Sequence, residues 1–377
     1  MQLRLLSLFS GIGAFEKALG NKVELVNYCE IDKYAAKAYS VIHNVSEDLN
    51  LKDIRTVDTS TLKDIDLITY GFPCVDISQA GKQKGFVDDN GNVTRSGLFF
   101  EALRIIKDLQ PKYAICKNVK ALTSKKFEKE FKLVLDSLSA VGYNNYYQVL
   151  NAKDYGIPQN RERIFIISIR KDVDNGSFVF PDKMPLNIRL KDILEDVVDE
   201  KFYLSQDKIK SLKASLFMLE TKCVIEKEIE IVGHTKSGGE RSAILSTTGI
   251  CNCLSATDYK QPKQIVEDAK VMQIGNIKPK NSWDNPQYGR VYNANGISPS
   301  LLTMQGGNRQ PKIIEQKQDF RIRKLTPLEC WRLMGFEDTD FWKVKNSGIS
   351  NSQLYKMAGN SIVVNVLRAI FRELLNE

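Results

Sequence analysis

The chain has 377 residues, of which 42% are hydrophobic and 27% charged, with a formal net charge of +8. This composition is typical of a folded intracellular protein with room for two domains, and no apolar run approaches the roughly 20 residues that cross a bilayer. The positive charge suits a polyanionic partner without proving one. Seven cysteines without a Cys-x-x-Cys pair, and only two histidines, favour free thiols in the cytoplasm over disulfides or a bound metal.

The first predicted element is an apolar strand over residues 3–9, followed by a turn that contains Gly11 and Gly13. Glycines at such a corner let the backbone approach a nucleotide-like ligand closely, although many tight strand-to-helix corners bind nothing. Glu16 stands where the dinucleotide-binding fingerprint has its third glycine. A dinucleotide is therefore still a possible ligand at this point, although Glu16 departs from the dinucleotide-binding pattern.

The second predicted strand, residues 23–28, leads to Glu30, and Asp53 and Ile54 follow after a predicted helix. A carboxylate at the end of the second strand is the acceptor that ribose hydroxyl groups need. The glycine turn and these two acids together indicate a ligand that contains adenosine.

The third predicted strand, residues 65–69, leads to Gly71 and Pro73, which stop strand pairing and fix the backbone. Cys74 comes next, at the usual ligand edge of an open α/β sheet. A segment rich in glycine and charge follows over residues 80–91 and is suited to closing over a ligand. A lone cysteine is more often a packed thiol than a nucleophile, so the neighbouring residues decide its role.

Predicted helices and strands then alternate, as in a doubly wound α/β domain. One strand delivers Lys117 to the same edge as Cys74. Arg161 and Arg163 lie on one face if their segment is extended, which suits a phosphate or a base carbonyl, with a salt-bridged surface strand as the alternative. In chain order these predicted elements are a helix over 95–109, a strand over 113–116, a helix over 127–140 and strands over 146–150 and 163–169.

The composition changes after Lys171 and predicts a second, smaller domain that is mostly β or irregular. Residues 172–232 are strongly charged, and from Gly233 onward the chain is rich in Gly, Ser, Thr, Asn and Gln. Its polar loops carry arginines that suit phosphates and base edges, although ordinary surface loops have the same composition. These arginines are Arg241, Arg290 and Arg309.

Residues 323–336 predict a helix with a defined start. Thr326 is placed as the N-cap, Pro327 as the first helical residue and Glu329 as the partner of Thr326 in a capping box. Gly335 is expected to end this helix. A long helical stretch over residues 353–375 is predicted near the end of the chain.

Five stretches, in this order along the chain, resemble the motifs of the DNA cytosine-5 methyltransferases of bacteria and phages. They are residues 9–13 (FSGIG), 72–74 (FPC), 81–85 (GKQKG), 159–163 (QNRER) and 358–361 (AGNS). The resemblance implies a Rossmann-like catalytic domain that uses S-adenosyl-L-methionine, over residues 1–174. It further implies a small target-recognition domain over 175–345 and a C-terminal helix over 346–377 that returns to the catalytic domain.

The resemblance also implies the residues of the site. In the family, the positions of Phe9 and Ile54 pack on adenine, Glu30 binds the ribose and Asp53 the adenine amino group. The full set expected to bind S-adenosyl-L-methionine is Phe9, Gly11, Ile12, Gly13, Glu30, Ile31, Asp53, Ile54, Gly71, Pro73, Leu98, Asn360, Ser361 and Ile362. DNA contacts are expected from Ser78, Lys82, Gln83, Lys84, Arg95, Arg241, Arg290 and Arg309.

The catalytic residues implied by the resemblance are Cys74, Lys117, Arg161 and Arg163. Carbon 5 of cytosine is a poor nucleophile, and addition of the Cys74 thiolate to carbon 6 of a flipped-out base activates it. The expected partner is double-stranded DNA bound by a monomer. The expected role lies in restriction–modification or phage protection, which brings a cognate restriction endonuclease into consideration as a further partner.

Lys117 departs from the family pattern, because most members carry a glutamate before the Asn-Val pair. Three interpretations stay open. The change cripples an otherwise standard enzyme, Lys117 donates a hydrogen bond to ring N3 with slower turnover, or the site is retuned for a modified base or a carboxylated methyl donor. Val75, where many relatives carry glutamine, is a lesser departure. A DNA-binding protein without turnover, and a dinucleotide-dependent or thiol enzyme without DNA affinity, are the alternatives from other classes.

Overall fold

The fold was analysed in a computed structural model. The part of the chain that the structure describes comprises residues 2–73, 86, 94, 96–188, 190–202, 231–234, 243–246, 264–266, 273–276, 290–293, 297–301, 312–315 and 321–375.

A six-stranded sheet of order β2-β1-β3-β4-β7-β5 forms the centre of the larger domain. Strands β1 to β4 are parallel, and β7 runs antiparallel to both β4 and β5. The carboxyl ends of β1 to β4 and the start of β7 therefore meet at one edge. The strands are β1 (Leu3–Leu8), β2 (Val23–Cys29), β3 (Leu67–Tyr70), β4 (Tyr113–Val119), β5 (Tyr143–Asn151) and β7 (Glu162–Arg170).

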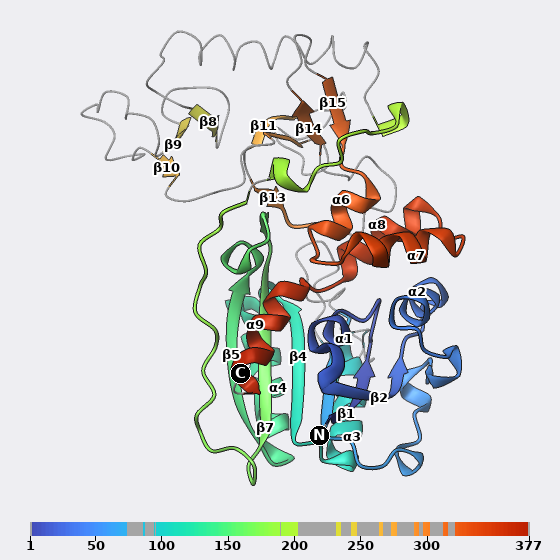
Figure 1. Cartoon of the computed structure of the whole chain (residues 1–377). Helices are drawn as coiled ribbons and strands as arrows, with labels where there is room; N and C mark the ends of the chain where they lie inside the picture. The colour runs from blue at the N-terminus through green and yellow to red at the C-terminus, as the bar shows by residue number, and fades with distance from the viewer. Residues whose placement is uncertain are drawn as a thin grey trace, which may run out of the picture.

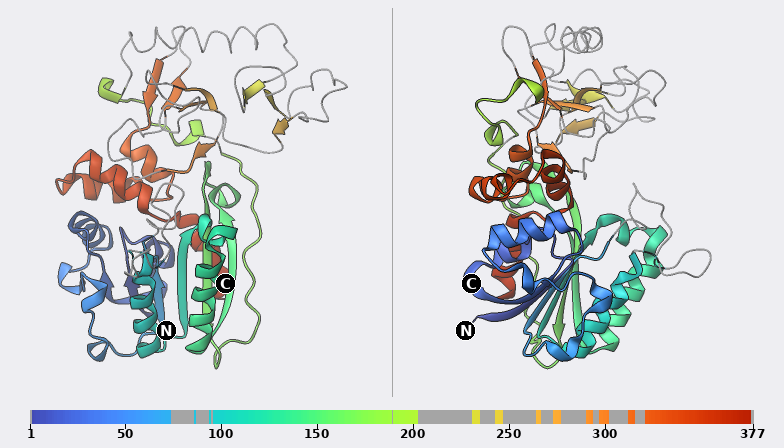
Figure 2. Two further views of the ribbon diagram at one scale, coloured as in Figure 1. Left: turned by 180° about the vertical axis from the view of Figure 1, so that it is seen from behind. Right: turned by 90° about the vertical axis from the view of Figure 1, so that its right-hand side faces the viewer.

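Helices cover both faces of this sheet (Figures 1 and 2), so the predicted doubly wound α/β arrangement is confirmed. Alternate strand residues point to opposite faces, which divides the core into two hydrophobic clusters. Leu5, Leu67 and Ile115 pack with α1, α2 and α9, whereas Ile68 and Cys116 pack with α3 and α4. The helices are α1 (Ala14–Leu19), α2 (Lys33–His43), α3 (Phe99–Leu109), α4 (Glu128–Ala140) and α9 (Val364–Leu374).

The described part of the smaller domain consists mainly of short strands, as predicted. A three-stranded sheet has the order β10-β9-β8 and a four-stranded sheet the order β11-β12-β14-β15. Figure 1 shows these strands above the carboxyl edge of the large sheet. They are β8 (Ile231–His234), β9 (Ala243–Ser246), β10 (Gln264–Val266), β11 (Gln273–Asn276), β12 (Arg290–Asn293), β14 (Lys312–Glu315) and β15 (Arg321–Lys324).

The two domains are joined by a small parallel ladder in which β13 (Ser298–Pro299) pairs with β6 (Gln159–Asn160). Beside it lie α6 (Pro327–Arg332), α7 (Asp338–Asn346) and α8 (Asn351–Asn360). The predicted capping box of α6 is confirmed: the Thr326 hydroxyl accepts from the Glu329 amide, and the Glu329 carboxylate accepts from the Thr326 amide. Ion pairs from Lys17 to Asp340 and from Lys356 to Asp32 tie α7 and α8 to the larger domain.

The predicted long helix over 353–375 is wrong in one respect, because the chain breaks it into α8 and α9. Ser361, the C-cap of α8, has an extended backbone, and α9 begins at Val364. Arg161 donates to the carbonyl oxygens of Gly359 and Ser361, at 2.8 and 2.9 Å. These bonds satisfy carbonyl groups that a continuous helix would bond internally.

The three cysteines within the described residues, Cys29, Cys116 and Cys330, are free and buried. Burial raises the pKa of the Cys29 thiol to about 12, with further contributions from the charges of Glu30 and Asp53. Burial likewise raises the pKa of Cys116 and Cys330. Within the described residues, no helix combines the length and the apolar character that a membrane crossing requires.

Candidate active site

The chain makes a tight turn between β1 and α1 at the carboxyl edge of the sheet. Phe9, Gly11 and Gly13 all have positive φ angles, of 52°, 57° and 77°. The Gly13 amide donates to the Ser10 carbonyl at 3.0 Å, and the Ser10 amide donates to the Cys29 carbonyl at 3.2 Å. A Cβ atom on Gly11 would meet nothing within 4 Å. The backbone of the turn therefore borders open space, which permits a ligand to approach it closely.

Glu30 connects this turn to the end of β2. Its carboxylate accepts hydrogen bonds from the Gly11 amide at 2.9 Å and from the Asp32 amide at 2.8 Å. Burial raises the pKa of Glu30, and these amide donors oppose the rise. The side chain of Asn50 brackets the Glu30 backbone, accepting from its amide and donating to its carbonyl, each at 3.0 Å. The predicted ribose acceptor and the glycine turn thus form one hydrogen-bonded unit.

The other residues predicted near the adenosine differ in their surroundings. Ile54 is buried, whereas Ile31 exposes 70% of its surface beside Glu30. Asp53 forms an ion pair with Arg55, with 2.5 Å between Oδ2 and Nη2, and the hydrogen bond from Arg55 lowers the pKa of Asp53. A ligand amine that binds Asp53 would have to share this carboxylate with Arg55.

The ends of β3 and β4 are linked by a side-chain hydrogen bond. Asn118, which is buried, donates from Nδ2 to the Phe72 carbonyl at 3.3 Å. The Phe72 ring packs on Phe99 at 5.4 Å between centroids, next to the half-buried Leu98. A Cβ atom on Gly71 would lie 3.3 Å from the Lys117 carbonyl. Residues 71–73 are therefore fixed against the end of β4, while Cys74 itself lies outside the described residues.

Lys117 and Arg163 lie on the same face of the sheet. In the antiparallel ladder Lys117 is opposite Phe165 and Val119 is opposite Arg163, and opposed residues share a face. Both side chains are half-buried. Arg163 donates to the Glu162 carbonyl at 2.7 Å and to the Ser300 hydroxyl at 3.4 Å. Two cationic side chains are thus placed on one face, next to the fixed start of the cysteine loop.

Arg161 has a different environment from Arg163, although the sequence predicts a catalytic role for both. Its side chain is 3% exposed. Nη1 donates to the Leu301 carbonyl at 2.8 Å, and Nη2 donates to the carbonyls of Gly359 and Ser361. Its guanidinium group thus ties the residue between β6 and β7 to the small domain and to the α8–α9 break, which indicates a positioning role.

Gln159 and Asn118 are functional candidates that the sequence did not single out. Gln159 is fully buried, accepts from the Leu301 amide at 3.1 Å and donates to the Leu333 carbonyl at 2.7 Å. Both residues stand inside stretches that resemble family motifs, and this position was the available signal. Gln159, however, bonds Leu301 and Leu333, which lie outside the five motifs, whereas Asn118 bonds Phe72 of the FPC motif.

Of the other predicted site residues, the structure describes some and not others. At the α8–α9 break, Asn360 is exposed, Ser361 is buried and Ile362 is half-buried. Arg290 is the first residue of β12, an inner strand of the four-stranded sheet. The remaining predicted DNA contacts lie outside the described residues: Ser78, Lys82, Gln83, Lys84, Arg95, Arg241 and Arg309.

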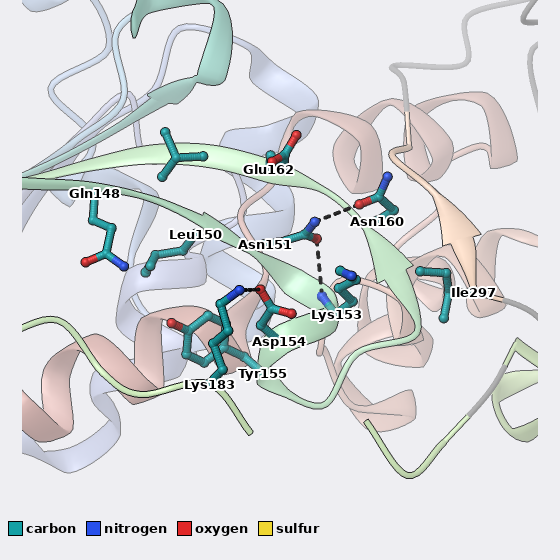
Figure 3. Close-up of a pocket in the computed structure, with 11 residues that line it drawn as sticks. Gln148, Leu150, Asn151, Lys153, Asp154, Tyr155, Asn160, Glu162, Lys183 and Ile297 are labelled. Carbon is teal, nitrogen blue, oxygen red and sulfur yellow. Dashed lines mark hydrogen bonds and ion pairs between the residues drawn. The ribbon is translucent and has the colours of Figure 1, made fainter. Parts of the chain in front are cut away.

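A hollow of about 520 Å³ lies elsewhere, between β5, the start of β7 and residue Lys183 (Figure 3). None of the predicted site residues lines it. Its polar groups pair with one another: Asn151 donates to Asn160 at 2.6 Å, and Lys183 forms an ion pair with Asp154 at 3.4 Å. Within the described part of the chain, no group of three or more His, Cys, Asp or Glu residues is placed to hold a metal ion.

Comparison with known proteins identifies the family of the chain. The model of the C-5 cytosine-specific DNA methylase family matches residues 3–376. The chain belongs to this family. It is a DNA cytosine-5 methyltransferase, and the resemblance drawn from its five motifs is confirmed.

Curated relatives of this methyltransferase come from phages and bacteria. The orphan methyltransferase M.SPRI of Bacillus phage SPR is 36% identical over 436 residues, covering 100% of this chain and 98% of the relative. The type II methyltransferase M.HhaI of Haemophilus parahaemolyticus is 34% identical over 370 residues, covering 98% and 93%.

Solved structures support the fold of the methyltransferase. Dnmt2 of S. pombe has a TM-score of 0.64 at 18% identity and covers 100% of both chains. A putative DNA modification methyltransferase from an E. coli prophage has a TM-score of 0.60 at 20% identity, covering 100% of this chain and 99% of that one. The Rossmann-like fold class is therefore confirmed.

Proposed function

We propose that this methyltransferase transfers a methyl group from S-adenosyl-L-methionine to carbon 5 of a flipped-out cytosine, with Cys74 as the nucleophile. One observation carries the proposal: the Asn118–Phe72 hydrogen bond fixes the start of the cysteine loop against the strand end that bears Lys117. The Gly11–Glu30 unit lies at the same edge of the sheet, two strands away from β4. A cofactor site and a nucleophile are thus expected side by side.

The residues of the turn fit S-adenosyl-L-methionine. Space in front of Gly11 is open, and the buried Ser10 hydroxyl has no hydrogen-bond partner among the described residues. Glu30 has a carboxylate with spare lone pairs for ribose hydroxyl groups, and Ile54 offers an apolar surface for adenine. Phe9, held in a left-handed conformation, is expected to pack on the other face of the adenine. When bound there, the cofactor supplies an electrophilic methyl group on a sulfonium centre.

Cys74 performs the covalent step in this proposal. Its thiolate forms a bond to carbon 6 of cytosine, and the electron pair of the 5,6 double bond becomes available at carbon 5 for methylation. Loss of the carbon 5 proton and expulsion of the thiolate then restore the aromatic ring. Nearby cations favour the thiolate over the thiol, and Lys117 and Arg163, which share one face of the β4–β7 ladder, are the candidates for this effect.

Lys117 takes the place of the family glutamate in this chemistry. Its ammonium group donates a hydrogen bond to ring N3, which draws electrons from the ring as the thiolate adds. It has no acceptor for the exocyclic amine, so we expect slower turnover than with a carboxylate. A second candidate function rests on the same residue: a homologue that binds and flips DNA with impaired catalysis.

Nucleoside mass spectrometry of duplex DNA incubated with labelled S-adenosyl-L-methionine tests the proposal. We expect labelled 5-methylcytosine from the native protein and none from Cys74→Ala. Lys117→Glu separates the two candidates. A large gain in rate identifies Lys117 as a lesion and supports the impaired homologue, whereas an unchanged or lower rate supports Lys117 as the N3 donor. Tight DNA binding without product from either protein contradicts methyl transfer by this site.

The biological setting completes the proposal. The small domain, residues 175–345, reads the target sequence, and the C-terminal segment 346–377 returns to the catalytic domain. The protein acts as a cytoplasmic monomer on double-stranded DNA, in restriction–modification with a cognate endonuclease or in phage protection without one. Names of similar proteins support both settings, since M.HhaI is a type II methyltransferase and M.SPRI an orphan one.

A further inference from the structure

The imidazole of His43, the last residue of α2, lies directly against the glycine turn. Its Nε2 atom is 3.2 Å from the Ile12 carbonyl oxygen. A Cβ atom built on Gly13 would lie 1.9 Å from the same nitrogen and 2.6 Å from Cδ2. The ring therefore occupies the volume that any side chain at position 13 would need. His43 thus contacts residues 12 and 13, whereas the space at Gly11 is open.

The His43 ring is itself supported from behind by buried aromatic side chains. Tyr39, one helical turn earlier, packs against it with 4.6 Å between ring centroids, and Tyr28 of β2 stacks on Tyr39 at 4.0 Å. The Tyr39 hydroxyl donates to the Glu16 carboxylate at 2.9 Å. Tyr39 is fully buried and Glu16 is 7% exposed. The cluster formed by Glu16, Tyr28, Tyr39 and His43 thus connects α1, β2 and α2 behind the turn.

The contacts of Glu16 account for its departure from the dinucleotide-binding pattern. It stands where a dinucleotide-binding turn has its third glycine, which serves close packing of the helix on the strand. Here a carboxylate occupies that position and binds Tyr39 instead. The turn is consequently backed by a fixed polar and aromatic cluster, with His43 as the member that contacts its backbone.

We propose that His43 is a positioning residue for S-adenosyl-L-methionine, an inference that rests on the proposed function of the turn. The imidazole N–H donates to the Ile12 carbonyl and fixes the peptide that separates Gly11 from Gly13. The Gly11 amide is thereby kept on Glu30, and the open face keeps its shape before the ligand arrives. Preorganisation of this kind lowers the cost of binding and leaves the chemical step untouched. His43 therefore affects cofactor affinity and not turnover at saturation.

Calorimetric titration of the full-length protein with S-adenosyl-L-methionine, without DNA, tests this role in three variants. His43→Ala removes the donor, His43→Gln keeps an N–H at a similar distance, and Ser40→Ala is the matched control on the same helix. Ser40 also bonds a backbone carbonyl, that of Val45 at 2.6 Å, but that carbonyl lies outside the turn. We expect a Kd about tenfold higher for His43→Ala, corresponding to one hydrogen bond. His43→Gln and Ser40→Ala should stay near the native value.

Two further measurements separate positioning from a general loss of stability. In the ligand-free protein, amide hydrogen exchange of residues 10–14 should be faster in His43→Ala and unchanged in Ser40→Ala. In methylation assays, His43→Ala should raise KM for the cofactor and leave kcat within about twofold. Equal weakening in His43→Ala and Ser40→Ala, or unchanged exchange with unchanged Kd, overturns the inference. Failure of the native protein to bind the cofactor instead overturns the proposed function.

Discussion

The glycine turn and the domain junction differ in how far along the chain their contacts reach. At the turn, Gly11 bonds Glu30 across 19 residues and His43 bonds Ile12 across 31. At the junction, Arg161 bonds Leu301 across 140 residues and Ser361 across 200. The turn is thus a local structure that one segment can build. The junction exists only when three distant segments have come together.

This difference shows why neighbouring residues of one motif have different roles. Arg161 and Arg163 are two positions apart, and both donate to the Ser300 hydroxyl, at 3.3 and 3.4 Å. Arg161 meets backbone carbonyls from two other segments and is buried by them, whereas Arg163 stays half-buried opposite Val119. One arginine of the motif is thus fixed inside the domain junction, and the other lies half-buried on the face that also carries Lys117.

The largest effect on stability is expected from Arg161→Ala, which removes hydrogen bonds of the domain junction and none of the glycine turn. The substitution leaves the carbonyls of Leu301, Gly359 and Ser361 without their donor in a buried position. We expect the free energy of unfolding to fall by about 3 kcal/mol or more, because each unsatisfied buried group costs about 1 kcal/mol or more. Urea denaturation measures it. Arg163→Ala is the control, and an equal loss of stability in that variant would break the distinction.

A smaller loss of stability, but a large loss of cofactor binding, is expected from Gly11→Ala. The φ angle of 57° costs an alanine about 1 kcal/mol, and its methyl group projects into the open space in front of the turn. Gly20 is the matched control, since it also has a φ angle of 57° and nothing within 4 Å of a Cβ atom. Gly20→Ala should lose stability and keep native affinity for S-adenosyl-L-methionine. Equal affinities in both variants would argue against the turn as the cofactor site.

The smallest effect concerns the ion pair between Lys356 and Asp32, which joins the turn region to α8 at 2.6 Å. Burial would raise the pKa of Asp32, but hydrogen bonds from Lys356 and two amides outweigh it and lower the pKa. This stabilisation is present above the unfolded pKa of about 3.9 and is lost as pH falls through the folded value. Lys356→Met should therefore cost about 1 kcal/mol at pH 7, and progressively less below pH ~4. Unfolding curves at pH 7 and below pH ~4 measure the loss of stability in Lys356→Met. A loss that does not change with pH would contradict its origin in the ion pair.

The sequence predicted those elements well that carry local signals. The apolar runs of β1 and β3 and the capping residues of α6 were readable in single segments. The extension of β4 to Val119 was not predicted, since residues 117–119 are held in the sheet by pairing with β7. The break at Ser361 was missed for the same reason: the group that satisfies its carbonyl is Arg161, which lies 200 residues away between β6 and β7.

In the candidate site, too, features set by local sequence could be predicted, and features set by side-chain contacts could not. Glu30 was predicted from its position after a strand, and its bond to Gly11 lies within the same βαβ unit. The backbone partners of Arg161 could not be predicted, because nothing in the motif reveals which carbonyl groups will surround it. The adenine contact of Asp53 stays a prediction, and its pairing with Arg55 depends on side-chain geometry that a sequence pattern does not contain.

The three buried cysteines are expected to be unreactive in the folded protein. Cys29, Cys116 and Cys330 are shielded from solvent, and their raised pKa values leave almost no thiolate at neutral pH. An alkylating reagent applied to the folded protein should therefore leave all three thiols unmodified. Any rapid modification then reports on the other four, Cys74, Cys223, Cys251 and Cys253. Peptide mapping after a brief pulse can thus follow the proposed nucleophile in the native protein without removing a single cysteine.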